Sequence, residues 1–330
     1  MTANSDLVDE AIQLGLTIDR LAQHSFAGVL DRLQALRKQM AVLVIEVDPT
    51  GVTRDVDRRA RLEKLIDRID QEIAAAYAEM RRGVDRDLDN VGTLTQDSLS
   101  ALLALLLLIK GLSRELDFSA RSSARKAVLI EGITVADWWD RQKTDMQFRV
   151  RRVLDDAMRL TQIGKEPGTA DLVNAITSNE PGSLFSAAPG HAEGLIRSAH
   201  HAGANMVRFE MILRHPELFR AFMHISVLDM STTKVCKMRS NRLWSLDGAP
   251  IGHTLPFARP PLHWRCRSHL IAVMHDFSDM PSRIQRRIGR EYFDGKVSPE
   301  PNMTAWLKVR NQERDAGPVD YQTARTLLGL

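Results

Sequence analysis

The residues best suited to chemistry are two cysteines and two histidines in the last third of the chain. Cys236 and Cys266 are the only cysteines, and His263 precedes Cys266 by three residues. A His-x-x-Cys pair can place an imidazole nitrogen and a sulfur on one side of a turn, while the distant cysteine supplies another soft ligand. Neutral imidazole and thiolate are ligands of Zn²⁺, so these three residues with His253 predict a zinc site that stabilises a loop-rich module.

Other roles for these residues stay open. Asp229 or His269 could replace His253 as the fourth ligand. Cys236 and Cys266 could form a disulfide, although a reducing compartment disfavours it. Both could be buried thiols that act as small hydrophobic side chains. A Cys–His dyad oriented by Asp229 would be a nucleophile, but no oxyanion loop accompanies it.

The same segment is basic. Residues 231–270 hold seven Lys and Arg residues against Asp247, so the segment carries +6, whereas the whole chain carries +3. A basic block of this kind can face phosphate or an acidic partner, or it can be a solvated loop.

An ordered series of short motifs runs through this segment. Its members are Asp229 with Thr232, then Cys236, then Asp247-Gly248, then Pro260-Pro261 with His263, Cys266 and Arg267. This order resembles the signature of the phage Mu F-like minor head proteins, and the resemblance covers about residues 130–330. Family members often carry another cysteine two residues after the last one, where this chain has Ser268.

The resemblance implies a minor capsid or head-morphogenesis protein of a tailed phage or prophage. Such a protein enters the prohead near the portal, assists DNA packaging or ejection, and is not an enzyme. Its expected partners are the portal, the major capsid or scaffold protein, and packaged DNA, with no membrane. It would be made in the host cytoplasm and reside in the virion, in the capsid interior or at the portal vertex. The candidate DNA or partner contacts are Lys234, Lys237, Arg239, Arg242, Arg265, Arg283, Arg286, Arg287 and Arg290.

Two other classes of function remain as alternatives. A cytoplasmic zinc-containing nucleic-acid-binding module would use the same basic residues without capsids. A Cys/His enzyme is the other, although the sequence contains no Gly-rich phosphate loop, no His-Glu-x-x-His and no Gly-x-Ser-x-Gly.

The N-terminal part of the chain predicts a helical hairpin. Apolar residues at spacings of three and four form a first stripe of Phe26, Val29, Leu33, Leu36, Met40, Leu43 and Val47, and a second of Leu62, Ile66, Ile69, Ile73, Ala76 and Met80. A turn at 48–51 separates them, so the two stripes predict an antiparallel pair of helices. Leu99–Leu112 is apolar almost all round and predicts a separate helix buried on every side.

The expected fold class is therefore mainly α, with a small α+β module. The predicted segments are 1–112, a hairpin with the Leu-rich helix as a docking or oligomerisation arm; 113–222, the helical core of the Mu F-like region; 223–300, the Cys/His-containing module; and 301–330, a helical tail. Thr134 is the predicted N-cap of a helix, and Pro216 is expected in the first turn of another helix at 215–219. Strands are expected near 224–229 and 269–274, with a basic helix at 282–293. The start of the chain lacks the pattern of a secretory signal, and the apolar run 102–109 is too short to span a bilayer.

Overall fold

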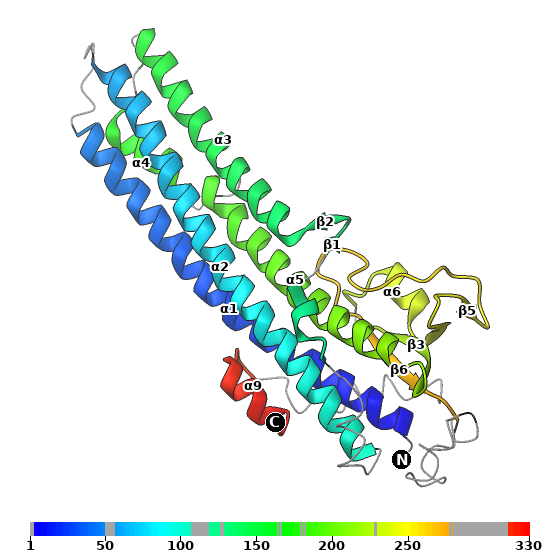
Figure 1. The fold of residues 1–330 in the computed structure, drawn as a ribbon. Coiled ribbons are helices and arrows are strands. Elements are labelled where there is room, and N and C mark those ends of the chain that lie inside the picture. The colour runs from blue at the N-terminus through cyan, green and yellow to red at the C-terminus, as the bar shows by residue number, and fades with distance from the viewer. Residues whose placement is uncertain are drawn as a thin grey trace. The chain divides into compact units, whose positions relative to one another are not determined.

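The computed structural model describes residues 3–49, 57–106, 119–125, 129–163, 165, 167–178, 180, 183–227, 230–276, 279 and 316–330. It is mainly helical with a small antiparallel sheet (Figure 1), which confirms the predicted fold class. Unit 1 contains residues 1–24, 85–133 and 197–330, and unit 2 contains residues 25–84 and 134–196. Both units draw on α1 (Ala3–Val47), α2 (Arg58–Leu106) and α5 (Leu184–Arg214), so they interleave along the sequence, unlike the consecutive predicted segments.

Unit 2 is a helical bundle that begins with the predicted hairpin. Ion pairs Arg32–Glu79 and Arg68–Glu46 (3.2 Å) join α1 to α2, as expected for antiparallel neighbours. The buried residues of the two stripes are Val29, Leu33, Leu36, Met40, Leu43, Leu62, Ile69, Ile73 and Met80. In the second stripe Leu65 and Tyr77 are also buried, whereas Ile66 and Ala76 are half-buried, because a straight helix drifts relative to a strict heptad.

The Leu-rich segment is not a separate helix buried on every side. Its described part is the end of α2, which continues without a break to Leu106. Leu99 and Leu103 are buried, but Leu105 is 67% exposed. The segment therefore keeps the one-sided burial of the rest of α2, and residues 107–112 lie outside the described residues.

The helix α3 (Val135–Gln162) begins at the predicted cap, directly after the short strands β1 (Leu129–Ile130) and β2 (Ile133–Thr134). The Thr134 hydroxyl oxygen accepts a hydrogen bond from the Asp137 backbone N–H at 3.0 Å, which satisfies one free donor of the first turn. Within unit 2, α3 packs on α2 through a Tyr77–Trp139 edge contact with centroids 6.2 Å apart.

A buried ion pair closes the far end of the hairpin. Arg58 donates to Asp48 Oδ2 at 2.7 Å and to the carbonyl of Pro167 at 2.7 Å, and both charged side chains are 0% exposed. Thr169, the first residue of α4 (Thr169–Thr177), donates to the Asp48 carbonyl. The pair therefore fixes the ends of α1 and α2 to the segment that leads into α4.

Unit 1 is built on a sheet with strand order β5-β4-β3-β6. The strands are β3 (Phe219–Ile225), β4 (Arg242–Ser245), β5 (Pro250–Ile251) and β6 (His269–Met274), and all pairs are antiparallel. The strand predicted at 269–274 is β6, whereas the strand predicted at 224–229 overlaps β3 only at residues 224–225, because the chain enters the sheet earlier, at Phe219. The predicted helix at 215–219 is wrong, because 216–218 form a turn from which Leu218 and Phe219 N–H groups return to the His215 carbonyl, and β3 then begins.

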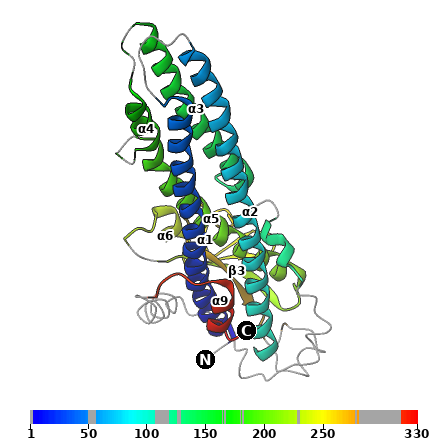
Figure 2. The same cartoon turned by 90° about the vertical axis from the view of Figure 1, so that its left-hand side faces the viewer.

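Helices cover this sheet within unit 1. Almost every residue of β3 and β6 is buried, and their core includes the first turns of α1 and the last turns of α2 and α5. A buried Arg208–Glu10 pair (2.6 and 2.8 Å) ties α5 to α1, and Ser98 of α2 donates to the same carboxylate at 2.6 Å. The helix α9 (Tyr321–Leu327) belongs to this unit (Figure 2), where Arg20 of α1 donates to the Gly317 carbonyl at 2.8 Å.

The close approach of α1 to β6 requires a glycine at position 15. A Cβ on Gly15 would lie 2.4 Å from Nε2 of the buried His269 ring. Gly15→Ala is therefore expected to lower the free energy of unfolding by about 1–3 kcal/mol through overpacking, measured by urea denaturation. Gly28→Ala, where no atom lies within 4 Å of the added Cβ, is the control and should be neutral or stabilising. Equal effects of the two substitutions would contradict the packing described here.

Among the described residues, no helix combines the length and the apolar character that crossing a membrane requires. The predicted basic helix at 282–293 and residues 301–315 of the predicted tail lie outside the described residues.

Candidate metal centre

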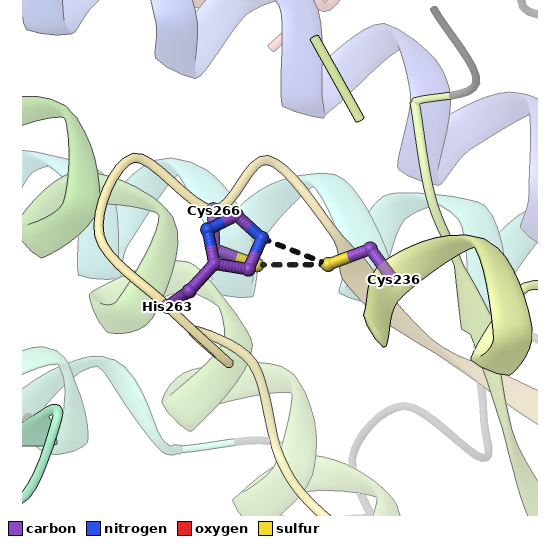
Figure 3. Close-up of side chains that lie close together, drawn as sticks. All are labelled: Cys236, His263 and Cys266. Atoms are coloured by element: carbon purple, nitrogen blue, oxygen red, sulfur yellow. Dashed lines mark hydrogen bonds between the residues drawn. The ribbon is translucent and has the colours of Figure 1, made fainter. Parts of the chain in front are cut away.

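Three of the four predicted ligands converge in unit 1. Cys236 lies on α6 (Lys234–Arg239), while His263 and Cys266 lie on the loop that leads into β6 (Figure 3). Their ligand atoms all lie within 4.8 Å of one another, with both cysteines buried and His263 half-buried. This Cys-His-Cys group can hold a metal ion.

The tautomer of His263 suits ligation. Its Nδ1 lies 2.8 Å from the Trp264 carbonyl oxygen, which can only accept, so Nδ1 carries the proton in the neutral ring. The lone pair of Nε2 then points toward Cys236 Sγ, 3.1 Å away. Such a backbone contact to the second ring nitrogen is the usual way in which a metal-binding histidine is oriented.

The spacing of the sulfurs matches a tetrahedral zinc site better than a disulfide. Two thiolates each about 2.3 Å from zinc lie about 3.8 Å apart at the tetrahedral angle. The observed Sγ–Sγ distance is 3.8 Å. A disulfide needs about 2.05 Å, and both cysteines are free thiols. The His263 nitrogen would move back by about 0.5 Å to reach its place in such a tetrahedron.

The loop that carries His263 and Cys266 is held by polar side chains from elsewhere in unit 1. The Trp264 N–H donates to Glu131 at 3.3 Å, and the Arg265 N–H donates to Ser198 Oγ at 2.7 Å. A tight turn places Arg265 at φ +60°, and the Cys266 N–H returns to the His263 carbonyl at 3.2 Å. Both ligands of the loop are therefore fixed by the turn between them.

Buried polar contacts also fix the segment after Cys266 and the helix α6. Asn205 of α5 donates to the Ser268 carbonyl at 2.9 Å and accepts from the Leu270 N–H at 2.8 Å. Ser226 donates to the Cys236 carbonyl at 2.9 Å, and its oxygen lies 3.1 Å from the Ser268 hydroxyl. Sequence reasoning missed these supporting residues. Asn205 gave no signal of its own, because its neighbours on the helix include the polar residues His201 and Arg208.

The contact between the two sulfurs shifts the pKa values of Cys236 and Cys266 in opposite directions. The hydrogen bond from the Cys236 thiol lowers the pKa of Cys266 to about 6, even though burial opposes this, and N–H groups of Leu262 and Ser268 act in the same direction. The same contact, together with burial, raises the pKa of Cys236. Cys266 is thus the thiol that is more readily a thiolate, the form in which cysteine binds metal.

The prediction that His253 is the fourth ligand is corrected by the structure. His253 is not part of the group, because Nε2 pairs with the Leu243 carbonyl at 2.8 Å and Nδ1 accepts from the Leu255 N–H at 3.2 Å. The alternative ligand His269 lies in the core against His201, with ring centroids 5.1 Å apart. Asp229, whether as ligand, motif residue or orienter, lies outside the described residues.

The other motif residues shape the loops around the group. Asp247-Gly248 forms the turn between β4 and β5, where Gly248 has φ +89° and its N–H donates to the Ser245 carbonyl at 2.9 Å. Thr232 donates to the Val227 carbonyl, and the Pro260–Pro261 bond is cis. Arg267 lines a cavity of about 20 Å³ in unit 1 together with Asp19, His201 and His269.

The basic residues of this module divide into two kinds. Lys234, Lys237, Arg242 and Arg265 are exposed, whereas Arg239 is half-buried and donates to the Pro256 carbonyl at 3.4 Å. Arg283, Arg286, Arg287 and Arg290 lie outside the described residues. The described part of the predicted basic surface is therefore Lys234 and Lys237 on α6, Arg242 at the start of β4 and Arg265 on the loop before β6.

Two buried histidines in unit 1 predict a loss of stability in acid. Burial, with a smaller contribution from Arg239, lowers the pKa of His224 to about 3, and burial also lowers the pKa of His269. Above about pH 6.5 both rings are neutral whether folded or unfolded, but below it the unfolded chain binds the protons first. The free energy of unfolding is thus expected to fall by about 1.4 kcal/mol per pH unit for each ring below that pH.

Urea denaturation of the metal-free protein between pH 7 and pH 5 measures this slope. His224→Gln is expected to reduce it, while replacing the exposed His24 with Gln leaves it unchanged. A stability that stays constant over this range would contradict the neutral, buried state of both rings.

The fold and site together define a mainly helical protein with a small antiparallel module that carries a Cys-His-Cys metal-binding group. Comparisons with family models, with curated proteins and with solved structures gave no match to this chain. Function is therefore inferred from its residues and their geometry.

Proposed function

We propose that the chain is a minor head-morphogenesis protein of a tailed phage or prophage, which enters the prohead near the portal and assists DNA packaging or ejection. The convergence of Cys236, His263 and Cys266 within 4.8 Å carries the proposal. These residues belong to the motif series that resembles the Mu F-like family, and Cys236 stands thirty positions before Cys266. A chance order of residues has no reason to meet in space, so the convergence supports the resemblance.

The metal proposed for the group is Zn²⁺. Two thiolates and an imidazole are the donors that structural zinc sites use, and magnesium or calcium would require oxygen ligands instead. Zinc there would link α6 to the loop before β6 by metal–ligand bonds, where the two segments now meet through the hydrogen bonds of Cys236 to His263 and Cys266 and through the contacts of Ser226 and Ser268. Its role would be to hold a recognition surface rigid.

That surface is the exposed basic face of α6 and the adjoining loops. Lys234, Lys237, Arg242 and Arg265 are exposed there, and Asp247 is the only acidic residue in the sequence from 231 to 270. Contacts with packaged DNA or with an acidic face of the portal would be directed at phosphate or carboxylate groups and would weaken with salt, without base-specific readout.

Quantitative mass spectrometry of gradient-purified particles tests the proposal. The particles would come from cells that produce this protein together with the products of its neighbouring genes. We expect the protein to co-purify with particles at a few copies each, with most of it near the portal in dissociated heads. Absence from particles at every stage of assembly would contradict the proposal.

The exposed basic face also favours a second candidate, a cytoplasmic zinc-containing nucleic-acid-binding module. This alternative predicts salt-sensitive binding of the purified protein to duplex DNA and no association with particles. A Cys/His enzyme has less support, because Cys236 and Cys266 are 2% and 0% exposed and a substrate would not reach either sulfur.

A further inference from the structure

Unit 2 contains a groove of about 450 Å³ that the proposed function does not use. Side chains of α1, α4 and α5 line it, namely Leu30, Leu33, Gln34, Arg37, Lys38, Ala41, Thr177, Phe185 and Pro189. Leu33 and Phe185 are buried and form its apolar floor, while Leu30, Ala41 and Pro189 are half-buried along its sides. A hollow of this size with an apolar floor can accept side chains from a partner.

The groove has the length of a short helix. It follows α1 from Leu30 to Ala41, which spans about 16 Å at 1.5 Å per residue. Ile45, four residues beyond Ala41 and thus on the same face of α1, is 52% exposed and extends the apolar surface. A lining that follows about three helical turns and combines apolar with basic side chains suits one amphipathic helix better than it suits a compact small molecule.

The basic residues that line the groove indicate which charge the polar face of a bound helix would carry. The charged residues among those that line it are Arg37 and Lys38, both basic. Neither forms an ion pair with a residue that the structure describes, unlike Arg32 and Glu46 on the same helix, which pair with α2. Two unpaired cations beside an apolar floor complement carboxylates that flank an apolar stripe.

We propose that this groove binds an acidic amphipathic helix of a partner protein. The apolar side chains of that helix would contact Leu33 and Phe185, and its carboxylates would lie beside Arg37 and Lys38. The proposal does not depend on the assignment as a head protein. It can be tested on the purified full chain, whereas that assignment is tested on particles.

The test is fluorescence anisotropy with two labelled synthetic peptides of about four helical turns. Both carry Leu at every third or fourth position; one has Glu and the other has Lys at the remaining positions. We expect the acidic peptide to bind at micromolar concentration and the basic peptide to bind at least about tenfold more weakly, with the difference reduced by salt. No binding of the acidic peptide up to about 1 mM would overturn the proposal.

Variants locate the binding site. Arg37→Glu with Lys38→Glu is expected to weaken binding of the acidic peptide about tenfold or more, and Ala41→Trp is expected to weaken both peptides by filling the groove. Lys64→Glu with Arg152→Glu makes the same change of charge at exposed positions of unit 2 outside the groove and should leave binding unchanged. Circular dichroism would confirm that each variant is folded. Equal weakening by the groove pair and the control pair would show non-specific attraction and contradict the proposal.

Discussion

Replacing Arg58 with alanine is expected to lower the free energy of unfolding by about 3–5 kcal/mol, because it removes the hydrogen-bonded partner of the buried Asp48 carboxylate. Arg58 is fully buried, donates to Asp48 at 2.7 Å, and also satisfies the carbonyl of Pro167. Arg61 lies 3.5 Å from the other oxygen of Asp48 and cannot take over both contacts. Urea denaturation followed by circular dichroism measures the loss.

Two further variants separate the buried pair from a general effect of losing an arginine. Arg59→Ala removes the side chain of the neighbouring arginine, which pairs with Glu63 where both side chains are more than half exposed. It should lower the free energy of unfolding by no more than about 0.5 kcal/mol. Arg58→Met combined with Asp48→Leu removes both buried charges and should recover most of the lost stability. A similar small loss for Arg58→Ala and Arg59→Ala would contradict the description of the hairpin end.

If the Cys-His-Cys group binds Zn²⁺ as we propose, removing the metal is expected to destabilise unit 1 about as strongly as Arg58→Ala destabilises the hairpin end. A ligand that binds only the folded state adds about 4 kcal/mol of stability when its free concentration is a thousand times its Kd. The reduced protein should therefore unfold at a clearly lower temperature in chelator than in excess zinc, as measured by calorimetry. The quantity to compare between variants is this gain from zinc.

Variants of the proposed ligands and of His253, which is not part of the group, test whether the gain in stability from zinc depends on this site. Cys266→Ser and His263→Ala should abolish the gain from zinc, because each removes one member of the three-residue group. His253→Gln should retain the gain, since both ring nitrogens of His253 are engaged with backbone groups. A gain that depends on His253 and not on His263 would contradict the geometry of the site.

Periodicity and local chemistry predicted much of the fold. The apolar spacing of Val29, Leu33 and Leu36 found the hairpin because burial of one helical stripe depends on nearby residues alone. The Thr134 cap was found for the same reason, since its partner Asp137 is three residues away. The prediction that the Leu-rich segment is buried on every side was wrong, because apolar composition does not reveal whether other parts of the fold cover each face of a helix. Leu105 remains exposed.

The candidate site was predicted less completely because its geometry depends on distant pairings. Residue type and spacing identified Cys236, His263 and Cys266. The choice of His253 failed, because its place was decided by the hairpin of β4 and β5, which directs its ring to the Leu243 carbonyl. The supporting residue Asn205 lies 63 positions from Ser268, and no local pattern indicates such a contact.

The central claim is that Cys236, His263 and Cys266 form a metal centre, and metal analysis of the purified, reduced protein tests it most directly. Inductively coupled plasma mass spectrometry after equilibration with zinc and removal of the free ion should find about one zinc per chain, and none in Cys236→Ser. A wild-type protein that holds no metal under these conditions, and melts at the same temperature in chelator and in zinc, would contradict the claim and leave two buried thiols hydrogen-bonded beside His263.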